Sequence, residues 1–170
     1  TNAGALAALK PAFREGGTVT AGNAPGITDG AAALVIARRS SAEMQGLRPL
    51  ARITGYAQGR ARPHEVFIAP ILAVRQLSDK LGLRPADFEL IELNEAFAAQ
   101  VMADVRALEL DIERVNVNGG AIALGHPIGA SGARVLTTLL YAMRDRGDHT
   151  GLATLCLGGG EAVALAVELE

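Results

Sequence analysis

The segment Leu152–Leu169 reads LATLCLGGGEAVALAVEL and consists of two apolar runs separated by three consecutive glycines. Short, continuous apolar runs bounded by a glycine turn are typical of strands that are buried on both faces. We therefore predict a buried hairpin in which residues 152–157 and 162–169 are the strands and Gly158–Gly160 is the turn. This hairpin follows a series of alternating strands and helices.

Three helices are predicted upstream because apolar residues recur there every three or four positions. The first begins at Pro70 and ends at Gly82, the second has Asn94 as its N-cap, and the third begins near Ser131 and ends at Gly147. The apolar faces are Ile71, Val74, Leu77 and Leu81; Phe97, Val101, Val105 and Leu108; and Val135, Leu136, Leu139, Leu140 and Met143.

Extended segments alternate with these helices. Residues 50–57 and 88–93 are predicted strands, residues 58–65 a polar loop, and residues 115–118 a brief extended piece before a glycine-rich loop. Such alternation is typical of an α/β domain. We expect a mixed, mostly parallel sheet between two layers of helices.

The first 45 residues do not fit this alternation. Residues 22–30 are dense in turn formers, residues 31–37 form a short apolar run that predicts a buried strand, and residues 38–46 predict a short polar helix. Together they resemble the end of a different structural unit.

Composition excludes several classes of function. The 170 residues carry a formal charge of −2, which argues against nucleic-acid or membrane-surface binding driven by charge. The single cysteine excludes an intrachain disulfide and indicates a reducing, cytoplasmic setting, and no Cys/His spacing predicts a metal site. We find no apolar stretch long enough to span a bilayer and no signal-peptide pattern.

Three segments combine reactive side chains with glycines or small neighbours at the ends of predicted strands, where open α/β sheets place their sites. They are Asn94–Ala98, Asn118–Pro127 and Cys156–Gly160. Within the second, Gly120–Gly125 has the outer spacing of a phosphate-binding loop, but a histidine and a proline follow where lysine and serine or threonine are required. Phosphate binding by this loop is therefore not expected.

Each reactive residue has a structural explanation beside the chemical one. Asn94 is either a helix N-cap or the holder of a catalytic water. His126 is a structural loop histidine or a catalytic one, and the unusual backbone between Gly125 and Pro127 makes the second alternative as strong as the first. Histidines in polar loops, in contrast, are expected to be solvated; these are His64 and His149.

Cys156 ends an apolar strand, where most cysteines are inert. The glycines after it favour a reactive role, because they expose backbone N–H groups that a substrate oxygen can approach. Histidine, cysteine and asparagine together indicate nucleophilic or proton-transfer chemistry on a carbonyl compound.

Five segments resemble sequence signatures of the thiolase family. Asn94–Ala98, Asn116–Arg134 and Cys156–Gly160 look like the three C-terminal signatures, and Thr18–Gly26 with Asp29–Ala32 resembles the segment that closes the N-terminal half. The likeness implies two halves of βαβαβαββ architecture. Residues 1–45 would be a remnant of the loop region and last strand and helix of the N-terminal domain, and residues 46–170 the C-terminal domain.

The resemblance also implies a reaction. Thiolases join two acyl-CoA molecules by Claisen condensation, or cleave a 3-ketoacyl-CoA with free CoA, through an acyl-cysteine in the N-terminal half. An acetyl-CoA C-acetyltransferase is the favoured member. The alternatives are a degradative 3-ketoacyl-CoA thiolase for longer chains and a non-catalytic acyl-CoA-binding or assembly subunit. Coenzyme A and acyl-CoA would be substrates without a bound cofactor, and the N-terminal half and further copies, in a dimer or tetramer, would be partners.

Residue roles follow by position in the matching motifs. His126 would activate the acyl-carrying thiol of the other half, and Cys156 would remove and return the α-proton, which requires a thiol pKa lowered toward neutrality. Asn94 would hold a water that stabilises the enolate, and the Gly158 N–H would contribute to an oxyanion hole. Positions that line the pantetheine tunnel in the family are matched by Ala21, Ala96 and Phe97.

Two departures from the family pattern concern substrate contacts. Pro25 stands where many thiolases have a serine that contacts pantetheine, and Val66–Pro70 replaces a glycine-rich run next to the acyl pocket. The chain alone is expected to be inactive, because it has no second thiol to carry the acyl group.

Overall fold

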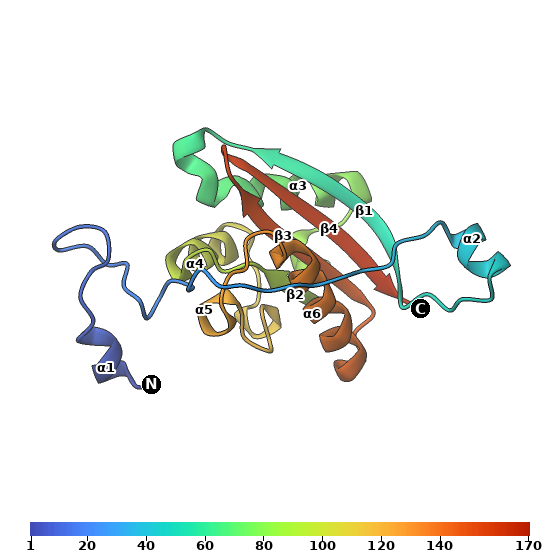
Figure 1. Cartoon of the computed structure of the whole chain (residues 1–170). Coiled ribbons are helices and arrows are strands. Elements are labelled where there is room, and N and C mark those ends of the chain that lie inside the picture. The colour runs from blue at the N-terminus through green and yellow to red at the C-terminus, as the bar shows by residue number, and fades with distance from the viewer.

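A four-stranded sheet forms the centre of the computed structural model, which describes residues 1–170 (Figure 1). Its strands follow the order β1-β4-β3-β2. The bounds are β1 Ala51–Arg60, β2 Leu90–Leu93, β3 Thr150–Leu157 and β4 Glu161–Leu169. β3 and β4 pair in antiparallel register from Thr150↔Glu168 to Leu157↔Glu161, so the predicted hairpin is confirmed.

The sheet is mixed, as predicted. β2 runs parallel to β3, while β4 is antiparallel to both of its neighbours, β3 and β1. Three strands therefore share one direction and β4 alone opposes them. Because β4 lies between β1 and β3, most neighbouring pairs are antiparallel although most strands are parallel in direction.

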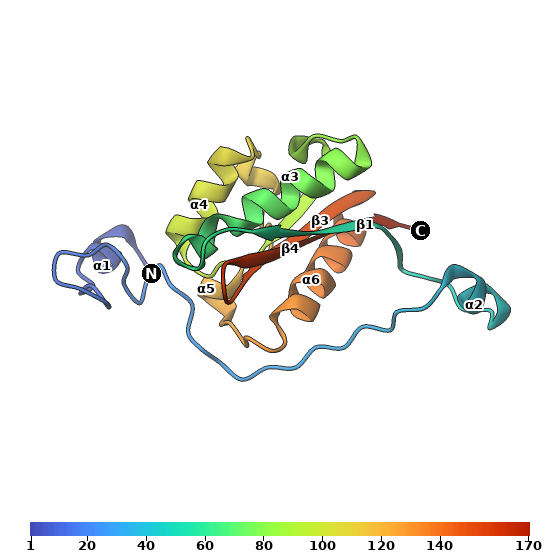
Figure 2. The ribbon, with the colours of Figure 1, turned by 90° about the horizontal axis from the view of Figure 1, so that it is seen from above.

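Helices cover both faces of the sheet (Figure 2). α3 (Ala69–Leu81) and α4 (Ala98–Ala107) pack on one face, and α6 (Ser131–Arg146) packs on the other. Each face has its own apolar core, because side chains alternate along a strand. Leu90 and Ala153 pack against α6, whereas Ile91 and Leu152 pack against α3 and α4.

The glycine stops of the helices are confirmed, but one predicted cap is wrong. Gly82 and Gly147 end α3 and α6 in the left-handed conformation, with φ of 68° and 78°. The N-cap of α4 is Phe97 rather than Asn94, whereas α6 begins at Ser131 as predicted, with Ala130 as its N-cap. The Asn94 side chain instead contacts His126 and Arg134.

The third strand of the βαβαβαββ pattern is reduced to one bridge, between Val115 and Ile91. The next residue, Asn116, has a φ of 50° and turns the chain away. A predicted polar loop is wrong in its first part, because β1 continues to Arg60 and pairs with β4 to its end. Short helical segments fill the connections: η1 Pro63–Ile68, η2 Pro85–Asp87, η3 Ile112–Arg114 and α5 Ala121–Leu124.

Residues 1–50 lie largely outside the packed layers. They contain α1 (Ala3–Ala7) and α2 (Arg39–Met44), which confirms the short polar helix, joined by an extended segment that passes on the α6 side of the sheet (Figure 2). The buried strand predicted for residues 31–37 is wrong, since Val35 is 97% and Ile36 70% exposed. A strand is buried only where other strands pair with it, and this chain supplies none here.

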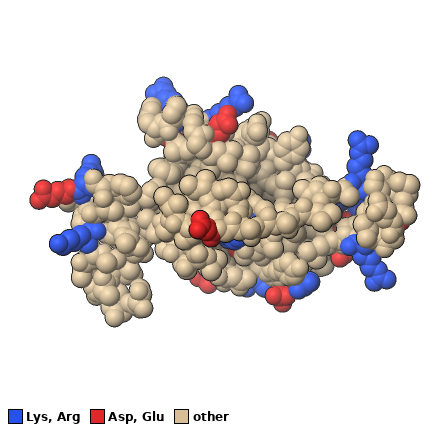
Figure 3. All heavy atoms as spheres, in the orientation of Figure 1, with Lys and Arg blue, Asp and Glu red and all other residues tan.

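Charged side chains lie mainly at the periphery of the face shown in Figure 3, and no broad positive patch occupies its middle. None of the helices is both long and apolar enough to span a bilayer.

Candidate active site

The predicted site residues gather at the carboxyl ends of β2 and β3. The two strands are parallel and pair Leu93 with Thr154, and the backbone N–H of Asn94 donates to the Thr154 carbonyl over 3.0 Å. Asn94, just past β2, and Cys156, near the end of β3, therefore lie at the same end of the sheet. Open α/β sheets bind their ligands at this end, beyond the carboxyl ends of the strands.

Asn94 and His126 are brought into contact. The Asn94 side chain is 1% exposed, and its Nδ2 lies 3.5 Å from Nε2 of His126. On the other side of the ring, Nδ1 lies 2.6 Å from Oγ of Ser131, which in turn donates to the carbonyl of Pro127 over 3.0 Å. The ring is thus held from both nitrogens.

The backbone of His126 is tied to the extended N-terminal segment. Its N–H donates to the Gly26 carbonyl over 2.8 Å, and Ile27 forms a parallel bridge with it. Burial lowers the pKa of the half-buried imidazole, and the positive charge of Arg134 lowers this pKa further. His126 is therefore a neutral ring at pH 7, which a general base requires.

Glu95 fixes the glycine-rich loop that carries His126. One carboxylate oxygen accepts from the N–H of Ile122 over 2.9 Å, and the other accepts from Nδ2 of Asn116 over 3.2 Å. A Cβ at Gly120 would lie 2.4 Å from the Glu95 carboxyl carbon, so a larger residue there would displace this carboxylate. Glu95 is thus a structural link between the end of β2 and the start of α5.

Cys156 is a free, half-buried thiol near the end of β3. Burial raises the pKa of this thiol and the Asp104 carboxylate raises it further, so the lowered pKa expected from the sequence is not found. Gly158 is exposed in the turn that follows. Gly159 and Gly160 adopt φ of 85° and 92°, so the turn depends on glycine.

Asp104 is a buried carboxyl group on α4. It is 0% exposed, its Oδ2 accepts from Nε2 of Gln100, and its Oδ1 has no partner. Desolvation raises the pKa of Asp104 to about 7, although the hydrogen bond from Gln100 opposes this shift. Gln100 also accepts from the N–H of Ala96 over 3.2 Å.

The three residues expected to line a pantetheine tunnel lie near the start of α4. Phe97 packs edge to face against Phe13 and Phe67, with ring centroids 6.1 Å and 5.1 Å apart. Ala96 is half-buried beside it and Ala21 is exposed. The turn that contains Ala21 is joined to α4, because Ala98 donates to the carbonyl of Asn23 over 3.0 Å.

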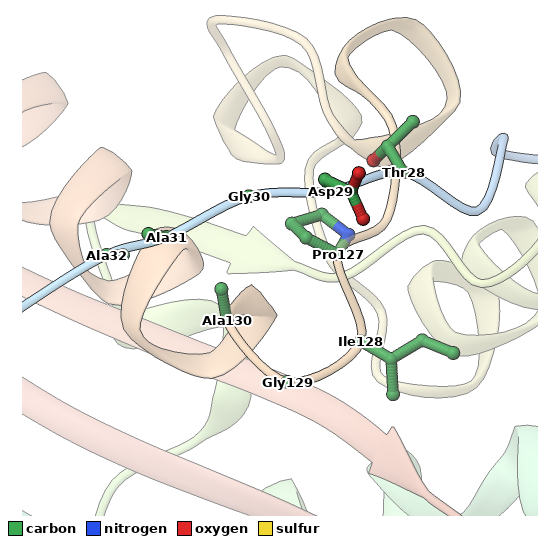
Figure 4. A pocket seen from close by; sticks show the side chains of 9 residues that line it. All are labelled: Thr28, Asp29, Gly30, Ala31, Ala32, Pro127, Ile128, Gly129 and Ala130. Atoms are coloured by element: carbon green, nitrogen blue, oxygen red, sulfur yellow. The ribbon is translucent and has the colours of Figure 1, made fainter.

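A separate depression of about 430 Å³ lies between residues 28–32 and 127–130 (Figure 4). It is bounded by Thr28, Asp29 and Pro127 and does not include Asn94 or Cys156. We therefore place the candidate site at the strand ends rather than in this depression. No three His, Cys, Asp or Glu side chains are grouped so that they could hold a metal ion.

The sequence patterns assigned no role in the site to four residues that shape it. Ser131 contacts His126, and Arg134 donates to Oδ1 of Asn94 over 3.4 Å. Glu92 faces Arg134, and the Asp104 carboxylate raises the pKa of Cys156. Two of them could have been recognised, because a carboxylate in the apolar strand 88–93 and another within the apolar stripe of α4 are exceptions to the burial rule.

Family models and solved structures agree with this fold. The model described as "Thiolase, C-terminal domain" matches residues 47–169, and that described as "Thiolase, N-terminal domain" matches residues 1–40. The chain belongs to the thiolase family. The Bacillus anthracis acetyl-CoA acetyltransferase superposes with a TM-score of 0.96 at 48% identity, covering 99% of this chain and 43% of that one. Human mitochondrial 3-ketoacyl-CoA thiolase in complex with CoA superposes with a TM-score of 0.92 at 38% identity, covering 100% of this chain and 43% of that one.

Curated relatives include acetyl-CoA acetyltransferases from several bacteria. The chain is 58% identical to that of Escherichia coli (strain K12) over 168 residues, which cover 99% of this chain and 43% of the relative. It is 55% identical to that of Allochromatium vinosum over the same shares. The chain therefore spans about two fifths of the length of these relatives.

Proposed function

We propose that this chain is the C-terminal part of an acetyl-CoA C-acetyltransferase. The observation that carries the proposal is the contact between Asn94 and His126 at the carboxyl end of β2, next to the end of β3 that contains Cys156. The relatives named acetyl-CoA acetyltransferase support this member of the family over others. In this proposal residues 1–45 belong to the N-terminal domain and residues 46–170 form the C-terminal domain.

Two covalent steps make up the proposed reaction. In the first, Nε2 of His126 takes the proton of a cysteine thiol in the N-terminal half; that thiolate attacks the thioester carbon of acetyl-CoA, and CoA leaves as its thiol with the proton of Cys156, which becomes a thiolate. In the second, the Cys156 thiolate takes the α-proton of another acetyl-CoA. The resulting carbanion attacks the acetyl carbon and acetoacetyl-CoA forms, while the acyl-carrying cysteine leaves and takes back the proton held by His126. Thiolysis is the same sequence in reverse.

Oxyanion stabilisation is the proposed role of Asn94 and Gly158. Asn94, through a water held together with His126, would stabilise the enolate oxygen, and the exposed N–H of Gly158 would face the second thioester oxygen. Losing one such donor typically costs about 100- to 1,000-fold in rate. Ala21, Ala96 and Phe97 would contact the pantetheine arm of CoA.

A degradative thiolase for longer 3-ketoacyl chains is the second candidate. It is supported by the superposition on human mitochondrial 3-ketoacyl-CoA thiolase. The ring of Phe67 against Phe97 argues for the short-chain alternative, because two aromatic rings occupy the region next to the expected acyl pocket. Comparing kcat/KM for acetoacetyl-CoA with that for 3-ketohexadecanoyl-CoA separates the two.

The experiment that tests the proposal joins the chain with an N-terminal thiolase half and measures acetoacetyl-CoA thiolysis. We expect turnover by the assembly, no turnover by the chain alone, and loss of α-proton exchange on acetyl-CoA after Cys156→Ala while acylation of the other half persists. Cys156→Ala that abolishes acylation as well would contradict the assigned roles. Binding of CoA without any turnover would favour a non-catalytic subunit.

A further inference from the structure

Two charged residues that the proposed reaction does not use lie directly behind Asn94. Glu92 is on β2 and Arg134 is in the first turns of α6, with 3.6 Å between Oε2 and NH1. Glu92 is 1% exposed and the Arg134 side chain 18%. Oε1 of Glu92 and both Nε and NH1 of Arg134 have no hydrogen-bond partner. A buried pair of this kind is weak evidence for stability, so its position calls for another explanation.

Arg134 determines how the Asn94 amide is oriented. Its NH2 lies 3.4 Å from Oδ1 of Asn94, and a guanidinium offers donors only. The amide oxygen must therefore face Arg134. The amide nitrogen is thereby turned toward Nε2 of His126, at 3.5 Å.

At the other end of this series of contacts, the direction of hydrogen-bond donation is also fixed. The carbonyl of Pro127 only accepts, so the Ser131 hydroxyl donates to it and accepts from Nδ1 of His126. This series of contacts thus begins at Arg134, which can only donate, and ends at the Pro127 carbonyl, which can only accept. Between them lie Asn94, His126 and Ser131, each of which can donate and accept hydrogen bonds. Only one direction satisfies every bond: Nδ1 carries the proton, and Nε2 presents its lone pair to Asn94.

We propose that Arg134, held by Glu92, is a positioning residue that fixes the Asn94 amide and thereby keeps neutral His126 in its Nδ1–H tautomer. The catalytic consequence rests on the function proposed above, because a base that acts through Nε2 needs the lone pair there. The tautomer itself does not depend on that function. The ionisable neighbours that act on this pair and on His126 are Arg134, Glu92 and Glu95. Burial raises the pKa of Glu92 to about 7, although the positive charge of Arg134 opposes this shift.

The tautomer is read from the ¹⁵N shifts of His126 in the 170-residue chain, assigned with His126→Gln. The exposed His64 and His149 serve as internal references. We expect the Nδ1–H form to dominate in the unchanged chain. Arg134→Met, which keeps an unbranched apolar stem and removes every donor, should raise the ratio of Nε2–H to Nδ1–H at least fivefold and raise the pKa of His126.

Arg134→Lys separates charge from geometry. The ammonium keeps the positive charge but not the planar set of donors, so the pKa of His126 should stay low while the tautomer ratio still moves. The matched control is Arg144→Met, which removes an exposed arginine of the same helix and should change neither quantity. A tautomer ratio that is unchanged in folded Arg134→Met overturns the proposal.

Glu92→Gln keeps the proposal testable if Arg134→Met does not fold. It removes the charge opposite Arg134 with little change in shape, and should move the tautomer ratio in the same direction by a smaller factor. No change in both Glu92→Gln and Arg134→Lys also overturns the proposal. In the assembly with an N-terminal half, Arg134→Lys should lower kcat about tenfold with KM unchanged, whereas no turnover by the unchanged assembly would contradict the proposed function alone.

Discussion

The amide nitrogen of Asn94 lies 3.5 Å from Nε2 of His126 although the two residues are 32 positions apart in the chain. Asn94 comes from the end of β2, and His126 from a loop that is held by Ser131 on one side and by the Gly26 carbonyl on the other. The contact therefore depends on three separate parts of the chain. It gives a direct way to test the site without turnover.

Asn94→Asp should raise the pKa of His126 by about one unit. A carboxylate beside Nε2 stabilises the charged imidazolium, although Arg134 partly offsets this effect. Titration of the ring by NMR measures the shift, and Asn94→Ala, which adds no charge, is the control. A lowered pKa in Asn94→Asp would mean that the two side chains are not in contact.

Asp104→Asn should lower the pKa of the Cys156 thiol. Burial is the larger cause of the raised pKa and remains in the variant, but the contribution of the Asp104 carboxylate is lost. Because Cys156 is the only cysteine, the rate of alkylation by iodoacetamide against pH reports this thiol alone. We expect the midpoint to move down by about half a unit or more. The exposed Asp111→Asn should leave it unchanged.

The same substitution should change how stability depends on pH. The pKa of Asp104 is raised from 3.8 to about 7, so between these values the folded state holds a proton that the unfolded state has lost. Unfolding free energy therefore falls as pH rises through this window and levels off above about 7. Asp104→Asn should be more stable than the unchanged chain at pH 8, by about 2–4 kcal/mol, and equally stable near pH 3. Urea unfolding at both pH values checks this, and an equal difference at both would rule out the charge as its cause.

Gly59→Ala should destabilise the fold by about 3 kcal/mol, the upper end for overpacking. A Cβ at Gly59 would lie 2.3 Å from the backbone N of Ala73 and 2.6 Å from the carbonyl oxygen of Ala69, so β1 and α3 would have to separate. Gly129→Ala is the matched control, since a Cβ there meets nothing within 4 Å. Thermal unfolding of both variants should show a large loss only for the first.

Elements with strong local signals were predicted well from the sequence. The hairpin around Gly158–Gly160 and the helix ends at Gly82 and Gly147 follow from short-range chemistry, namely apolar runs and the need for a left-handed residue. The N-cap assigned to Asn94 was wrong because the sequence shows which residues are able to cap a helix, but not which residue does so. Arg134, 40 positions away, takes up the Asn94 side chain instead.

The apolar run at residues 31–37 shows the opposite limit. Its composition is that of a buried strand, but burial is a property of the neighbours as well as of the run. The neighbours of Cys156 and Glu92 could not be predicted from the sequence either, because they come from distant helices. Asp104 lies on α4 and Arg134 on α6. The domain boundary near residue 45 and the roles of His126, Cys156, Asn94 and Gly158 stay predictions.

The hydrogen-bond chain from Arg134 to the Pro127 carbonyl has a consequence for the energetics of the site. Reversing any single bond would set two donors or two acceptors against each other, so all the bonds would have to reverse together, and the two ends forbid it. The ring consequently has one resting state before any substrate arrives. Folding, rather than substrate binding, supplies the reorganisation free energy that orients the base. When a proton has been taken up at Nε2 and released, the same two ends return the ring to its starting arrangement.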